Sequence, residues 1–121
     1  MRKINFRVWD NEGYMSKPFT LHELQAGLIQ FTLDCPVMQY TGLEDGYDNE
    51  IYEGDIVEGS SLGFGDHFID YVKFENGSFC FSKEKWKDGT FHWCSLENYD
   101  SEDLTVIGNI YQNLELLGEG E

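Results

Sequence analysis

Short runs of alternating apolar and polar residues dominate the chain, and turn-forming residues separate these runs. Ile4, Phe6 and Val8 alternate with polar neighbours, which is typical of a strand with one buried face. Similar patterns predict further extended segments at 29–33, 37–40, 51–52, 56–57, 68–74, 78–82, 91–96 and 104–111. Asn76-Gly77 between two of these segments favours a type I′ hairpin turn, and Gly108 is a candidate bulge.

One segment has helical periodicity instead. Thr20 and Glu23 have the spacing of a capping box, and Gly27 suits the end of a helix. Three leucines fall on one helical face: Leu21, Leu24 and Leu28. One short helix among many short strands predicts a mainly β fold (β-rich α+β), built as a closed or half-closed antiparallel barrel.

The pattern of strands and turns centres on the stretch 39–57. Two apolar runs flank an acidic, glycine-bearing loop at 42–49, and a second turn, Glu53-Gly54-Asp55, begins the next strand. We expect the Asp55 side chain to stabilise that turn through a hydrogen bond to the backbone. The glycine- and serine-rich segment 59–65 predicts a surface loop.

The charge balance excludes several classes of partner. The chain has 8 basic and 23 acidic residues, a net charge of −15, and no Lys or Arg from Pro18 to Val72. Such a surface repels phosphates and anionic lipids, so we expect neither direct nucleic-acid binding nor membrane binding. A basic protein partner fits the charge, and solubility alone is the alternative explanation. Three cysteines and no apolar segment of membrane-spanning length favour a reducing cytoplasm.

Acidic and aromatic residues of the central stretch form the candidate binding surface. The predicted partner-binding residues are Tyr40, Glu44, Asp45, Asp48, Glu50, Tyr52 and Trp93. Carboxylates beside aromatic rings suit a Lys- or Arg-rich partner, although bulky residues at such positions also build barrel cores. The loop lacks the alternation of an EF-hand, because its sixth position from Asp45 is Glu50 rather than glycine. We interpret it as a solvated acidic loop.

A second constellation suggests catalysis or zinc binding only weakly. His92 and Cys94 share one face of a predicted strand, and Cys80 lies on the neighbouring hairpin. With His22 or His67 these side chains could form a zinc site or a small hydrolase centre, but no Cys-x-x-Cys pair supports it. We therefore expect a buried Cys80 and no catalytic residue, metal or cofactor.

Four segments of the chain resemble the YopX family of phage and prophage proteins. They are INFRVWD at 4–10, MQYTGL at 38–43, EIYEGDIV at 50–57 and VIGNIY at 106–111, in the family's order. Where the family often has a basic or neutral residue after the Thr-Gly-Leu run, this chain has Glu44-Asp45.

The resemblance implies a mainly β fold with an SH3-like barrel element that begins at the Gly-Asp turn, in a phage or prophage protein acting inside a bacterial host. It implies no catalytic residue. We expect a single domain over 1–121, with N-terminal strands and a helix at 1–41, a barrel-like part at 42–113 and an acidic tail at 114–121. The function expected is a non-enzymatic interaction module that uses its acidic and aromatic face, in one version as a decoy that imitates DNA. The alternatives are a self-assembling structural protein and, third, a metal-dependent hydrolase.

Overall fold

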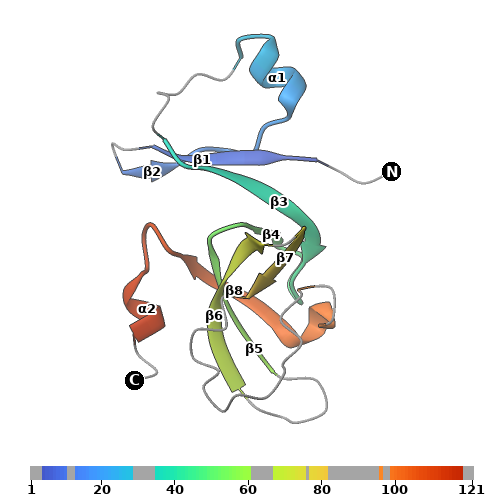
Figure 1. The fold of residues 1–121 in the computed structure, drawn as a ribbon, viewed down its shortest axis with the longest axis vertical. Coiled ribbons are helices and arrows are strands. Elements are labelled where there is room, and N and C mark those ends of the chain that lie inside the picture. Colours follow the sequence, from blue (N-terminus) through green and yellow to red (C-terminus); the bar gives the residue numbers. More distant parts are fainter. Residues whose placement is uncertain are drawn as a thin grey trace.

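The strands that the structure describes form two antiparallel four-stranded sheets (Figure 1). The computed structural model describes residues 4–10, 13–28, 35–60, 67–75, 77–81, 96 and 99–118. The elements in chain order are β1 (Phe6–Asp10), β2 (Tyr14–Met15), α1 (Leu21–Gln25), β3 (Val37–Glu44), β4 (Glu50–Tyr52), β5 (Asp55–Ser60), β6 (His67–Glu75), β7 (Ser78–Phe81), a 3-10 helix (Ser101–Asp103), β8 (Leu104–Asn109) and α2 (Glu115–Gly118). The expected mainly β, partly closed antiparallel fold is confirmed.

The first sheet has the order β2-β1-β3-β4. Strand β3 is long enough to pair with β1 at one end and with β4 at the other, so it crosses from the upper layer to the lower one in Figure 1. The structure extends β3 to Glu44, into the segment predicted as loop, with Gly42 at a φ of +92° where the pairing with β4 is irregular. Glycine adopts this left-handed conformation without the steric cost that other residues meet.

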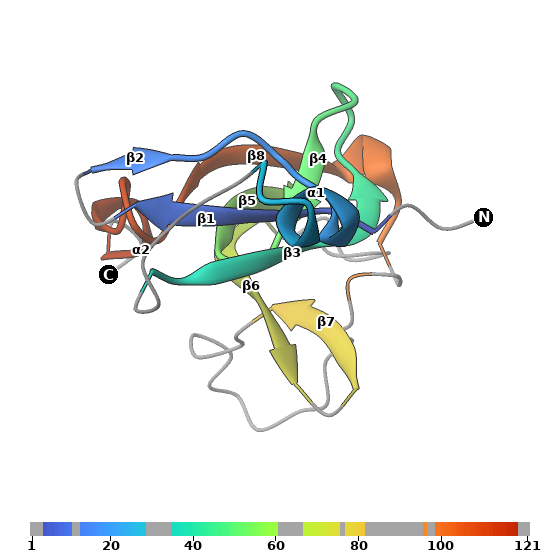
Figure 2. The same cartoon turned by 90° about the horizontal axis from the view of Figure 1, so that it is seen from above.

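The second sheet has the order β7-β6-β5-β8 and curls into a half-barrel. Figure 2 shows its β6–β7 hairpin to one side of strands β1 and β3. The hairpin has the predicted two-residue connection between Glu75 and Ser78. Gly77 there has the expected positive φ of +85°. The predicted bulge in the last strand is also confirmed, because the pairing of β5 with β8 shifts by one residue before Gly108.

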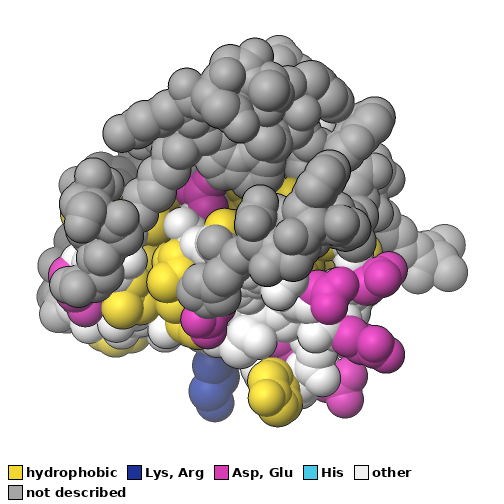
Figure 3. Space-filling model, turned by 90° about the horizontal axis from the view of Figure 1, so that it is seen from below, with side chains coloured by type: hydrophobic (Ala, Val, Ile, Leu, Met, Phe, Trp, Pro, Cys, Tyr) yellow, Lys and Arg dark blue, Asp and Glu magenta, His cyan; other side chains and the backbone are white. Residues whose placement is uncertain are grey.

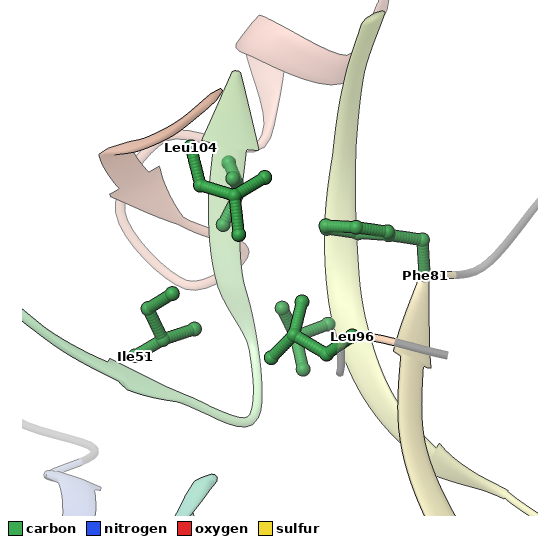
Figure 4. Packing of buried hydrophobic residues seen from close by; sticks show 6 residues of the cluster. Ile51, Phe81, Leu96 and Leu104 are labelled. Carbon is green, nitrogen blue, oxygen red and sulfur yellow. The ribbon is translucent and has the colours of Figure 1, made fainter. Parts of the chain in front are cut away.

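The core of the half-barrel is apolar and closely packed (Figure 4). Its buried members are Ile51, Val57, Val72, Phe81, Leu96 and Leu104. Phe68, Phe81 and Tyr99 form three mutual ring contacts at centroid distances of 5.0 to 5.6 Å. Ile51 comes from β4 of the first sheet, so both sheets contribute to this one core.

Helix α1 has the predicted ends but not the predicted packing. Thr20 and Glu23 form the capping box, and the Gly27 and Leu28 amides close the other end by donating to Leu24 and Glu23 carbonyls. The shared leucine face does not bury as a unit. Leu24 packs against Val8, Phe19 and Cys35, but Leu21 is 54% and Leu28 71% exposed. The helix has only five residues, so Leu28 lies beyond its end and the three leucines do not share one helical face.

Several sequence predictions lie outside the described residues, namely the strand at 29–33, all but the last residue of the strand at 91–96, and the loop from residue 61 on. The first two residues of that predicted loop, Gly59 and Ser60, belong to β5 instead. Within the part of the chain that is described, the acidic segment 100–103 before β8 contains the 3-10 helix, and α2 occupies part of the predicted acidic tail. The division of the chain at residues 41 and 113 stays a prediction.

Candidate functional site

The loop between β3 and β4 is built around the carboxylate of Asp45. One oxygen, Oδ1, accepts hydrogen bonds from the amides of Tyr47 and Asn49, both at 2.9 Å. The other, Oδ2, accepts from the Val106 amide at 2.9 Å and the Asn49 side chain at 3.2 Å. Burial raises the pKa of Asp45, but these hydrogen bonds outweigh it and hold the pKa below its ordinary value.

The sequence interpretation of this loop as fully solvated is therefore wrong at Asp45, which is only 2% exposed. Its carboxylate anchors the loop instead of facing a partner. The sequence could not show this, because the amide of Val106 that holds the anchor is 61 positions away.

The anchored loop lies against the 3-10 helix Ser101–Asp103, beside it in both Figure 1 and Figure 2. The Gly46 amide donates to the Leu104 carbonyl at 3.0 Å. A Cβ on Gly46 would lie 3.3 Å from the Ser101 carbonyl oxygen and 3.4 Å from the Glu102 Cα. A glycine thus lets two acidic segments, far apart in sequence, approach each other closely.

Together these segments form a surface that we name the acidic edge. Its exposed residues are Glu44, Tyr47, Asp48, Asp100, Glu102 and Asp103. Figure 3 shows acidic side chains gathered along one edge of the displayed face. Glu44 also lies directly opposite Glu50 in the β3–β4 pairing, an arrangement of like charges that costs stability.

The aromatic part of the expected surface changes in the structure. Tyr40 and Tyr52 are 5% and 2% exposed, with ring centroids 5.5 Å apart, so they are core residues, as the alternative interpretation held. Trp93 lies outside the described residues. The aromatic side chain of the acidic edge is instead Tyr47, which is 75% exposed. The sequence signal that could have identified Tyr47 is its position as a single aromatic residue within a run of Gly, Asp and Asn.

Buried Tyr52 nevertheless holds one carboxylate of the β3–β4 region in place. Its hydroxyl donates to the carboxylate of half-buried Glu50 at 3.0 Å. Burial, followed by the proximity of Glu50, raises the pKa of the Tyr52 hydroxyl, so it stays protonated and keeps donating. Of the predicted partner-binding carboxylates, the structure leaves Glu44 and Asp48 exposed and holds Glu50 in place.

An ion pair between the two sheets fixes this arrangement. The Arg7 guanidinium on β1 pairs with the Asp55 carboxylate on β5, and its Cζ lies 4.5 Å from the centre of the Tyr52 ring. Asp55 also accepts the Tyr52 amide at 2.8 Å, which confirms the predicted side-chain bond of the Gly-Asp turn. Gly54 has the positive φ of +85° that this turn requires.

The residues that suggested a metal centre do not assemble into one within the described structure. Cys80 is buried, as expected, and His92 and Cys94 lie outside the described residues. Across the described ranges, no group of three or more His, Cys, Asp or Glu side chains is placed to hold a metal ion. No helix in the same ranges is long and apolar enough to cross a membrane.

Comparison with known proteins agrees with the family resemblance and with the fold. The family model described as YopX protein matches residues 12–118, most of the chain. This chain belongs to the YopX family. Its fold is similar to that of protein EF1440 from Enterococcus faecalis, seen in a crystal structure, with a TM-score of 0.59 and 21% identity over 97% of this chain and 99% of that one. No curated protein matches the chain.

Proposed function

We propose that this YopX-family protein is a non-enzymatic interaction module that binds a basic protein through the acidic edge. The observation that carries the proposal is the convergence of two acidic segments, 44–50 and 100–103, around exposed Tyr47. Carboxylates attract Lys and Arg side chains, and an exposed aromatic ring offers a face on which a guanidinium can stack. Desolvated contacts of this kind are typical anchors of protein interfaces.

In one version of the proposal, the protein is a decoy. Closely spaced carboxylates on a protein of net charge −15 imitate the charge of DNA and would occupy a nucleic-acid-binding protein of the host or the phage. The phage or prophage origin and the bacterial cytoplasm as the place of action are parts of this proposal. The alternative of a self-assembling accessory protein stays a hypothesis, which the mass of the protein in solution tests.

Quantitative capture from host lysate tests the proposal with matched variants. Glu44→Gln with Glu102→Gln removes two charges from the acidic edge, and Glu75→Gln with Glu115→Gln removes two exposed charges from other elements. We expect wild type and the second pair to retain the same basic protein, released by rising salt, and the first pair to lose most of it. Equal retention by both pairs would exclude the acidic edge as the binding surface.

Tyr47→Ala measures the aromatic contribution separately from charge. Tyr14→Ala is a suitable control, because Tyr14 is also more than half exposed but lies on β2. Loss of a stacked guanidinium should weaken binding about three- to tenfold, which corresponds to a contribution of roughly 0.5–1.5 kcal/mol. An equal effect of both substitutions would show that Tyr47 has no specific part in binding.

A further inference from the structure

Strand β8 is the outer strand of the second sheet among the described strands. An edge strand presents unpaired amides and carbonyls, to which a strand of another chain can add. The sequence of β8, Leu104–Asn109, has no charge and no proline, and it includes Val106 and Ile107. Such a segment is prone to edge-to-edge pairing unless the protein covers it.

The β3–β4 loop covers the first half of this edge. The Val106 amide donates to Asp45 Oδ2 at 2.9 Å, and the Leu104 carbonyl accepts from the Gly46 amide at 3.0 Å. The Leu104 amide donates to the Ser101 carbonyl. A side chain and a loop thus make the hydrogen bonds that a neighbouring strand would otherwise make.

Asn113 covers the second half. Its Oδ1 accepts the Asn109 amide at 3.2 Å, and its own amide donates to the Asn109 carbonyl at 2.8 Å. A Cβ on Gly108 would lie 2.5 Å from Asn113 Oδ1, closer than side-chain atoms approach each other. Glycine at the bulge is therefore necessary for Asn113 to reach the edge.

We propose that Asp45 and Asn113 form an edge guard, which keeps β8 closed to strand addition by a second copy of this chain. A second copy is the occupant because the uncharged β8 sequences of two copies would pair antiparallel across a twofold axis. Asp45 precedes the strands of the second sheet in the sequence and Asn113 follows them, so each half of the edge is closed independently. This inference does not depend on the proposed function.

The test compares the mass of wild type with that of the variant Asp45→Ala with Asn113→Ala by light scattering after size exclusion. High salt screens the repulsion between chains of net charge −15. Asp100→Ala is the control, because it removes the same charge and its side chain makes no cap hydrogen bond. We expect the double variant to double its mass as concentration rises, while the control keeps the mass of wild type.

A double variant that is folded by circular dichroism and keeps the wild-type mass at high micromolar concentration would overturn the proposal. If the double variant does not fold, Asn113→Ala replaces it and leaves the Asp45 cap in place. The Asn109 amide should then exchange faster than in wild type, and an unchanged rate would overturn the proposal. Hydrogen exchange on wild type gives an independent reading. The Val106 and Asn109 amides should exchange as slowly as that of Thr105 within the β5–β8 pairing, and fast exchange at both would refute the guard.

Discussion

Replacing Arg7 with methionine should destabilise the protein strongly, because it leaves Asp55 without its partner. The Asp55 side chain is 2% exposed, and methionine keeps most of the apolar length of the arginine while removing its charge. Asp55 would retain the hydrogen bond from the Tyr52 amide at 2.8 Å, which compensates only part of a buried negative charge. The contact of the guanidinium with the Tyr52 ring is lost as well.

The expected magnitude follows from the burial of this pair. Removing one partner of a buried ion pair costs about 3–5 kcal/mol, against a total stability of roughly 5–15 kcal/mol for a domain. The melting temperature should fall by about 10 °C or more for a chain of this size. The variant Arg7→Met with Asp55→Asn should recover at least about 2 kcal/mol, because no buried charge remains and asparagine can still accept the Tyr52 amide.

The pH dependence of this loss has a definite sign. Burial raises the pKa of Asp55, and the ion pair with Arg7 opposes that rise. Without Arg7 the folded-state pKa rises further above the unfolded value of about 3.9. The variant is then most stable below that pH and loses stability as the pH rises through the folded-state pKa. The difference from wild type should therefore widen between about pH 4 and pH 7.

Urea unfolding at several pH values, followed by tryptophan fluorescence and circular dichroism, measures these differences. The slope of the free energy with urea should stay the same in all variants, since the fold is unchanged. A loss below about 1 kcal/mol for Arg7→Met would refute the reasoning, since a loss that small is typical of an exposed ion pair and not of a buried one. A double variant no more stable than Arg7→Met would refute it too.

Three further substitutions test separate parts of the structure by urea and thermal unfolding. Ile51→Ala removes a fully buried side chain shared by both sheets and should cost about 2–5 kcal/mol, so a cost under about 1 kcal/mol would contradict the common core. Thr20→Ala removes the capping box of α1 and should cost about 1 kcal/mol, whereas no change would show that the cap is dispensable. Asp45→Asn loses the stabilisation of a carboxylate whose pKa is lowered. That stabilisation is present above about pH 3.9 and disappears on acidification, so the melting temperatures of Asp45→Asn and wild type should converge at low pH; a constant difference would contradict it.

The parts of the fold predicted correctly depend on neighbours within a few residues. The capping box of Thr20 and Glu23, the hairpin at Gly77 and the side-chain bond of Asp55 each close within four positions, so local chemistry determines them. The bulge at Gly108 was similarly visible as a glycine inside a β-branched run.

The parts that sequence could not predict depend on contacts between distant segments. Asp45 was placed on the surface because a carboxylate in a turn is usually solvated, but its partner Val106 lies 61 positions away. The pairing of Arg7 with Asp55 spans 48 positions. Tyr40 and Tyr52 have sequence neighbours that fit either a surface or a core. Only the packing of distant segments decides between them, because Trp9, Met15 and Tyr111 cover the two rings.

The acidic edge is tested most directly by hydrogen exchange on the protein with and without the basic partner that it captures. If the edge is the binding surface, amides at 45–49 and 101–103 should exchange more slowly in the complex, while those of α1 and of the β6–β7 hairpin stay unchanged. Protection confined to α1 or to the hairpin, with no change at the acidic edge, would contradict the account.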